Sequence, residues 1–109
     1  NRRARRSMTS EARPALSTGK HELKTWPGPF ELLAIGAKRC EVRKADRPFR
    51  VGDCLWLREW DPFTRDYTGR HLTVLVTHMI EGGEWGVPSG LVIMSIMMWP
   101  PAQTEVTDG

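Results

Sequence analysis

The sequence predicts a mainly β (α+β) fold, a small β-barrel of five or six strands with one or two short helices. Three observations lead to this prediction. Short apolar or alternating segments recur along the chain, glycine and proline turn signals separate them, and one segment opened by prolines has helical character. Because the chain has 109 residues, it is long enough for one domain with a single modest core.

Composition divides the chain into three regions. Residues 1–18 are basic and lack apolar periodicity, so we expect a disordered tail, followed by a folded domain over 19–101 and a polar tail over 102–109. Residues 1–20 carry six basic side chains and one acidic one, whereas the rest carries ten basic and twelve acidic ones, a charge of −2. Attraction to phosphate must therefore come from the tail, through counterion release, or from a local patch. The tail is equally well explained as a leader without a role.

The first expected elements are a strand over 21–26 and a helix over 27–35. Prolines preset the backbone of a first helical turn, and Gly36 directly after the helix suits a left-handed cap. We expect the core side of this helix to carry Phe30, Leu33 and either Ile35 or Leu32.

The next strand covers 39–44, and its two faces differ in character. One face is charged and the other is apolar, with Arg39, Glu41 and Arg43 opposite Cys40 and Val42. A turn at 49–53 follows, in which Gly52 supplies the unusual backbone angles.

The second half of the domain predicts a hairpin, a loop and a last strand. Strand 54–60, turn 61–69 and strand 70–80 form the hairpin, and the glycine-rich residues 81–90 form a mobile loop. Because 91–98 is almost continuously apolar, we expect a strand buried on both faces. Within strand 54–60, one face carries Leu55, Leu57 and Glu59, and the other carries Cys54, Trp56, Arg58 and Trp60, of which Trp56 is expected in the core.

No membrane span, cofactor or metal site is expected. No apolar run approaches the roughly 18 residues of a membrane span, and no signal-peptide pattern follows the basic start. Cys40 and Cys54 lie in apolar strand patterns, which predicts two reduced, buried thiols in a cytoplasmic protein. The three histidines show no metal-ligand spacing.

The most site-like feature is a group of charged residues just after Gly36, formed by Lys38, Glu41, Arg43 and Lys44. Two chemical uses fit this group. Glu41 could orient a guanidinium that then binds a phosphate, or Lys38 could lose its proton in a dry environment and act as a general base. An ion-paired strand face without a ligand is the structural alternative.

Aromatic residues near turn signals favour a binding role. Trp26, Trp60, Tyr67 and Trp85 all occupy such positions, where an exposed ring can stack on a nucleobase. For each ring, simple packing is the competing interpretation. Trp85, within the glycine-rich loop, is the candidate for a mobile lid.

Residues 36–43 read G-A-K-R-C-E-V-R, which matches the motif G-x-K-x-x-E-x-R of the ASCH superfamily. Further stretches, from His21 to Trp26 and from Tyr67 to Arg70 among others, resemble a phage and prophage branch of that superfamily with no assigned function. The resemblance covers about residues 20–98. It implies a PUA-like β-barrel, and it implies that the first strand places Lys24 beside the motif.

The resemblance also implies function. PUA-like and ASCH domains are associated with RNA binding, and some members hydrolyse acylated cytidine nucleosides or cleave RNA. In the hydrolases a lysine, a threonine and a glutamate form the working set. Lys38 falls on the lysine position, Glu41 stands where the threonine would be, and Glu81 and Glu84 lie only near the region of the glutamate.

We therefore expect a module that binds RNA or a modified nucleotide, with no cofactor and no membrane association. The expected binding residues are Lys24, Lys38, Glu41, Arg43 and Lys44, with Trp26 and Trp85 as stacking rings. One alternative is a small hydrolase of acylated cytidine nucleosides or RNA that uses Lys38 and Glu41. A second alternative is a phage protein that binds a host protein.

Overall fold

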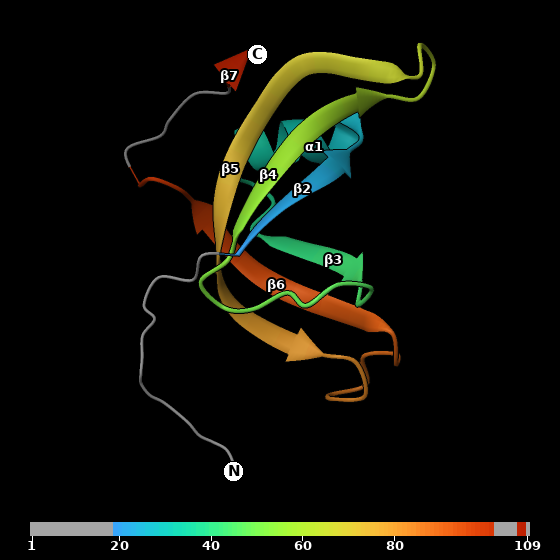
Figure 1. Cartoon of the computed structure of the whole chain (residues 1–109), viewed down its shortest axis with the longest axis vertical. Helices are drawn as coiled ribbons and strands as arrows, with labels where there is room; N and C mark the ends of the chain where they lie inside the picture. The colour runs from blue at the N-terminus through green and yellow to red at the C-terminus, as the bar shows by residue number, and fades with distance from the viewer. Residues whose placement is uncertain (1–18, 102–106, 109) are drawn as a thin grey trace.

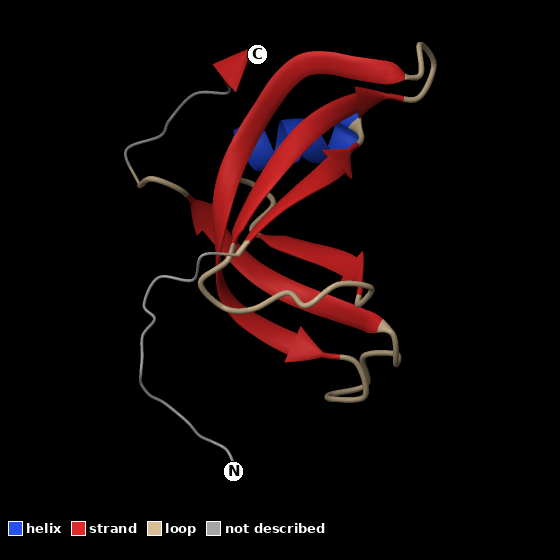
Figure 2. Ribbon diagram, viewed as in Figure 1, coloured by secondary structure: helices blue, strands red, loops and turns tan. Residues whose placement is uncertain are grey.

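The computed structural model describes residues 19–101 and 107–108, so the predicted basic tail at 1–18 lies outside the described residues. The fold is mainly β with one short helix, as predicted (Figures 1 and 2). In chain order its elements are β2 (Lys20–Thr25), α1 (Pro27–Ala34), β3 (Cys40–Lys44), β4 (Cys54–Asp61), β5 (Asp66–Glu81), β6 (Leu91–Met98) and β7 (Thr107–Asp108).

The strands form one sheet that curls into a half-barrel (Figure 1). The main path runs β2-β4-β5-β6-β3, and β7, which lies within the predicted polar tail, pairs with β5 off this path. β2 runs parallel to β4, and the other pairings are antiparallel. Among the described strands, β2 and β3 are therefore the two ends of the path, and the curl of the sheet turns them toward each other.

β5 belongs to both halves of the curled sheet. Its first half pairs with β4 and its second half pairs with β6. The register shifts between Val76 and His78, and such a bulge bends a strand. The strand begins at Asp66 instead of the expected residue 70, because Tyr67 already pairs with Trp60 across the hairpin. One bent strand thus connects the two walls of the half-barrel (Figure 2).

The core lies on the inner face of the curl and under α1. Phe30 and Leu33 of α1 are buried, whereas Leu32 and Ile35 are 48% and 69% exposed. The expectation that one of these two residues would reach the core was wrong, because a two-turn helix presents only one narrow stripe to the sheet. The sheet supplies the rest of the core, namely Leu23, Phe49, Leu55, Leu57, Leu72, Val74, Val76, Val92, Met94 and Ile96.

Three predictions about buried faces were wrong for one shared reason. β6 is not buried on both faces, because its residues alternate and Met97 is 41% exposed. Cys40 is a free, exposed thiol and not a core cysteine, and Trp56 is only half-buried. No second layer of the described chain covers the outer face of the sheet (Figure 1), so the apolar residues there stay in contact with solvent.

The glycine-rich segment between β5 and β6, predicted as a mobile loop, contains hydrogen-bonded turns. Gly83 N donates to the carbonyl of Val87 at 2.7 Å, and Val87 N donates to the carbonyl of Glu84 at 2.8 Å. Trp85 lies between these contacts with a positive φ of 51°.

None of the helices in the described part of the chain has the length and apolar character that crossing a membrane requires.

Candidate functional site

The end of α1 sets the position of Lys38. Gly36 has a φ of +80°, a backbone conformation that glycine adopts without strain. Gly36 N donates to the carbonyl of Leu33 at 3.1 Å, and Ala37 N donates to that of Leu32 at 2.9 Å, which together form a Schellman cap. Lys38 N also donates to the Leu32 carbonyl, at 3.0 Å. The predicted cap is confirmed, and it directs the chain from the helix straight into β3.

The faces of β3 are reversed relative to the usual apolar-in pattern. Glu41 is 3% exposed and Arg43 is half-buried, whereas Val42 is 52% exposed and Cys40 is exposed as well. β3 pairs with β6 through Glu41 opposite Met94, a fully buried residue. The charged face of β3 therefore points into the half-barrel, where a lone carboxylate would be costly and needs partners.

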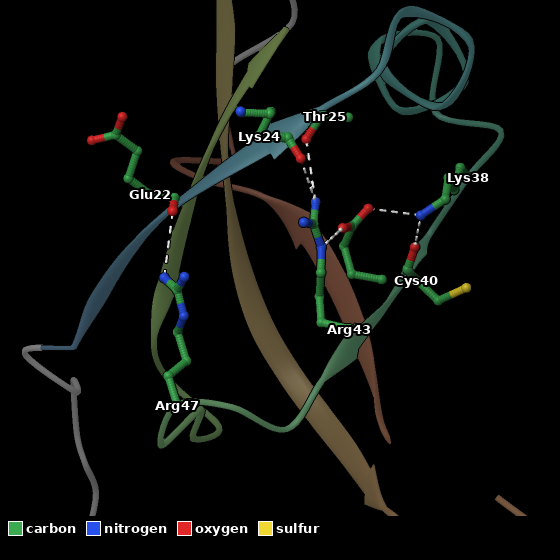
Figure 3. Close-up of polar contacts among 8 residues, drawn as sticks. Glu22, Lys24, Thr25, Lys38, Cys40, Arg43 and Arg47 are labelled. Carbon is green, nitrogen blue, oxygen red and sulfur yellow. Dashed lines mark hydrogen bonds and ion pairs between the residues drawn. The ribbon is translucent and has the colours of Figure 1, made fainter. Parts of the chain in front are cut away.

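Two cations, Lys38 and Arg43, compensate the buried carboxylate of Glu41, and Figure 3 labels both of them. Lys38 Nζ donates to Glu41 Oε2 at 2.7 Å, and Arg43 Nε donates to Glu41 Oε1 at 3.0 Å. Lys38 Nζ also donates to the carbonyl of Cys40. Both carboxylate oxygens thus have a charged donor, and both cations are held at fixed positions beside the carboxylate.

Arg43 also connects β3 to β2. Its Nη2 donates to the carbonyl of Lys24 at 3.1 Å and contacts the hydroxyl of Thr25 at 3.4 Å. Farther along, Arg47 Nη1 donates to the carbonyl of Glu22 at 3.4 Å (Figure 3). We call the line along which β2 and β3 face each other the seam. The described residues form no β-ladder between these two strands, so side chains bridge the seam in place of backbone pairing.

An open pocket of about 370 Å³ lies at the helix end of the seam. Its floor carries the Lys38, Glu41 and Arg43 group, and apolar surface from Trp26, Pro29 and Val42 forms part of its walls. The side chains of Lys38, Arg43 and Glu41 give the lining a formal charge of +1, while the ammonium of Lys24 lies over the Trp60 ring. Lys24, Thr25 and Cys40 complete the lining. Such a pocket suits an anionic ligand that also has an apolar face.

The pocket brings together five of the seven residues predicted from the sequence, namely Lys24, Trp26, Lys38, Glu41 and Arg43. Trp26 is 57% exposed at the start of α1, as a stacking ring requires. Lys44 does not line this pocket. Trp85 is 89% exposed, but it belongs to the loop between β5 and β6 and lines no part of this pocket.

The two glutamates near the expected hydrolase position are also outside the pocket. Glu81 N donates to Glu84 Oε1 at 3.2 Å, a contact within their own turn. Neither residue lines the pocket that holds Lys38.

Sequence reasoning missed Thr25 and the role of Glu59, both of which are buried beside the site. Thr25 pairs with Glu59 across β2 and β4, and Glu59 is 5% exposed. Glu59 Oε1 accepts a hydrogen bond from the Thr68 hydroxyl at 2.8 Å and lies 3.5 Å from Arg70 Nη1. The signal was present in the sequence, because Glu59 shares a strand face with two core leucines. A charged residue on a core face predicts a buried, paired carboxylate.

The remaining candidate rings carry cations of this chain on the outer face of the sheet. Lys24 Nζ lies 3.7 Å from the ring centre of Trp60, and the Arg58 guanidinium lies 3.7 Å from that of Tyr67. Trp60 and Tyr67 contact each other edge to face with ring centres 5.0 Å apart. Trp60 and Tyr67 are half-buried and already contact these cations. Trp26 is therefore the ring that the pocket can offer to a ligand.

Comparisons with known proteins identify relatives of the folded body. Residues 20–96 match the model of a domain of unknown function (DUF3850). The chain is also 37% identical over 65 residues to an uncharacterized 12.9 kDa protein in the GpA 3′ region of Escherichia phage P2. That match covers 60% of this chain and 58% of the phage protein.

Proposed function

The chain belongs to the DUF3850 family, a domain of unknown function, and from the geometry of its pocket we propose that it binds RNA or a modified nucleotide. One observation carries the proposal. A buried glutamate holds two cations at the floor of an open pocket whose wall includes an exposed tryptophan. Phosphate and a nucleobase are the two chemical groups that such a pocket complements.

The cations supply the phosphate contact in this proposal. Lys38 and Arg43 are both about a quarter exposed in their side chains, so each presents part of its charged group to the pocket. Arg43 Nη1 makes no hydrogen bond within the described part of the chain and remains available to a phosphate oxygen. Glu41 acts as a positioning residue, because it orients both cations without facing solvent itself.

Trp26 supplies the base contact. Trp26 is the N-cap residue directly before α1, and it lines the pocket together with Pro29 of the first helical turn. Stacking of a base on an exposed aromatic ring contributes roughly 1–3 kcal/mol and tolerates any base. We therefore expect modest sequence preference at this subsite.

We also propose that this family branch belongs with the PUA-like ASCH domains. The support is that each motif residue has a distinct structural role. Gly36 caps the helix, Lys38 and Arg43 flank Glu41, and Glu41 is buried between them. The residue that stands in the place of the hydrolase threonine is thus a buried, doubly paired carboxylate, which favours binding over hydrolysis.

The test measures binding and turnover together. The protein is titrated with a single-stranded oligouridylate of about ten nucleotides, a length within known single-strand site sizes, and is incubated with acylated cytidine while product is followed. Lys38→Ala is compared with Lys20→Ala, a matched control at the start of β2 that lines none of the pockets described here. We expect Lys38→Ala alone to weaken binding and to reduce the salt dependence of log K by about 0.7.

Two outcomes would overturn the proposal. Turnover of acylated cytidine that Lys38→Ala abolishes would assign the pocket to a hydrolase. Equal affinity of the parent protein, Lys38→Ala and Lys20→Ala for the oligonucleotide would remove the pocket from binding, and the search would move to a protein partner.

A further inference from the structure

A second pocket continues the first along the seam. It has a volume of about 230 Å³ and is lined by Leu23, Val42, Arg43, Lys44, Asp46, Arg47 and Phe49. Both pockets share Val42 and Arg43, so they lie in series on either side of the Arg43 side chain. We call the two pockets together the seam groove. Lys44, which the first pocket lacks, belongs to this second part.

The seam groove is a cationic region on an acidic body. Its lining includes five basic residues and two carboxylates, namely Lys24, Lys38, Arg43, Lys44 and Arg47 against Glu41 and Asp46. The ammonium of Lys24 lies over the Trp60 ring, which leaves four cations for the groove. The five basic residues are half of the ten after residue 20, where the net charge is −2. A charge of one sign concentrated in a groove attracts an elongated ligand of the opposite sign.

Arg47 is held more loosely than Arg43. Its hydrogen bond to the Glu22 carbonyl is 3.4 Å long, and its ion pair with Asp46 is 3.8 Å long between half-exposed groups. Exposed ion pairs of this kind contribute little to stability. The guanidinium also lies 5.7 Å from the ring centre of Phe49. Arg47 can therefore turn toward a phosphate or offer its plane to a base at small cost.

The two arginines donate hydrogen bonds to the carbonyls of alternate residues of β2. Arg43 reaches the Lys24 carbonyl and Arg47 reaches the Glu22 carbonyl. Residues two apart on a strand are separated by about 6.6 Å along the strand. The second pocket thus adds the guanidinium of Arg47 to that of Arg43, which both pockets share, and the two groups follow the direction of the groove.

We infer that the seam groove binds an extended segment of single-stranded RNA across two successive nucleotide subsites. This inference rests on the proposed function and names its ligand class. The first subsite contains Trp26, Lys38 and Arg43, and the second contains Lys44 and Arg47. A mononucleotide fills the first subsite alone, whereas an oligonucleotide gains the contacts of the second.

The test compares two lengths of the same ligand on the full chain. Uridine 5′-monophosphate and an oligouridylate of about ten nucleotides are titrated against the parent protein, Arg47→Ala and Arg65→Ala. Arg65 lies in the turn between β4 and β5, lines neither part of the groove, and serves as the charge-matched control. We expect the oligonucleotide to bind at least tenfold more tightly than the mononucleotide.

Arg47→Ala should remove most of that gain, reduce the salt slope for the oligonucleotide by about 0.7, and leave mononucleotide binding unchanged. Equal affinities for the two lengths, or an oligonucleotide affinity that Arg47→Ala does not change, would overturn the second subsite while leaving the first in place. Failure of both ligands to bind would overturn the proposed function itself.

An extended acidic peptide is the alternative ligand of the seam groove, because the edge of a strand can also pair with a peptide strand. An oligoglutamate peptide with the same charge as the oligonucleotide tests this alternative. If the peptide binds as tightly as the oligonucleotide and loses affinity equally in Arg47→Ala, the groove belongs to an acidic peptide and the RNA assignment is wrong.

Discussion

Arg43 Nε and Glu41 Oε1 lie 3.0 Å apart on the inner face of β3, and the same guanidinium reaches the Lys24 carbonyl of β2. One side chain therefore satisfies a buried carboxylate and bridges the seam. Because the same residue shapes the pocket, stability and binding are coupled at this point of the fold.

Replacing Arg43 by alanine should destabilise the protein. The change leaves the 3% exposed Glu41 with one cation instead of two and removes the bridge to β2. Because Lys38 still pairs with the carboxylate, we expect a loss of about 1–3 kcal/mol, the cost of leaving one buried acceptor without its donor. Urea unfolding followed by tryptophan fluorescence measures this change. Arg65→Ala should change the unfolding free energy by less than about 0.5 kcal/mol, and equal effects of both variants would refute the buried role of Arg43.

Glu41→Gln should lower stability more than Glu22→Gln. The carboxamide keeps one acceptor oxygen, so its NH₂ group must face either Lys38 or Arg43, which are both donors. We expect a loss of about 1–3 kcal/mol at Glu41. Glu22 pairs with Arg58 at 2.7 Å but is 49% exposed in its side chain, and exposed pairs contribute about 0–1 kcal/mol. Urea titrations of both variants test the order, and a larger loss for Glu22→Gln would contradict it.

Trp26→Ala and Trp85→Ala distinguish a ring in the pocket from a ring that is merely exposed. Trp26 lines the pocket at 57% exposure, whereas Trp85 is 89% exposed on another loop. Loss of a stacking ring should weaken oligouridylate binding by about 1–3 kcal/mol for Trp26 and leave it unchanged for Trp85. Fluorescence anisotropy of a labelled oligonucleotide measures both affinities. A loss confined to Trp85→Ala would restore the lid hypothesis.

Gly19→Ala should destabilise the start of β2. A Cβ atom at Gly19 would lie 2.2 Å from Oδ1 of Asp53, a residue that is 1% exposed. Asp53 cannot move freely, because its Oδ2 accepts a hydrogen bond from Arg50 N at 2.9 Å and lies 2.7 Å from His21 Nε2. We expect a loss of about 1–3 kcal/mol in thermal or urea unfolding.

Gly28→Ala is the control for that experiment. A Cβ atom at Gly28 meets nothing within 4 Å, and the residue lies in the first turn of α1. Alanine favours the helix by up to about 1 kcal/mol over glycine. Equal destabilisation by the two alanines would show that the contact with Asp53 is not the cause.

Phe30→Ala and Ile35→Ala test which face of α1 joins the core. Phe30 is 0% exposed and Ile35 is 69% exposed. Truncation of a buried phenylalanine costs about 3–5 kcal/mol, whereas the exposed isoleucine should contribute less than about 0.5 kcal/mol. Calorimetric unfolding of the two variants measures the difference. Similar losses would place both residues in the core and contradict the described helix packing.

Much of the fold was readable from local sequence. Prolines at the start and Gly36 at the end bounded α1, and short segments between turn signals located β2, β3, β4 and β6 to within about two residues. The charged group after Gly36 was also found, because five charges within the seven positions 38–44 are visible without a structure. These signals depend on backbone preferences and side-chain period, which act over a few residues.

The errors share a long-range origin. One of Leu32 and Ile35 was expected inside, as were Cys40 and Met97, and all four are exposed, because apolar character does not say whether a second layer covers a face. Lys44 and Trp85 were grouped with Lys38 because they are near it in sequence or occur in a loop, whereas the structure places Lys44 in the second part of the seam groove and Trp85 on the loop between β5 and β6.

Local sequence specified most of the elements, their order and a charged cluster. Packing in three dimensions determines that Glu41 points into the core, that Arg43 joins β3 to β2, and that Thr25 and Glu59 lie beside the site. The cations that pair with Glu41 are two and three residues away in sequence, but its burial depends on Met94 of β6 and on the approach of β2, which are distant in sequence. The curl of the sheet brings β2 to Arg43, and no local pattern in the sequence specifies that curl.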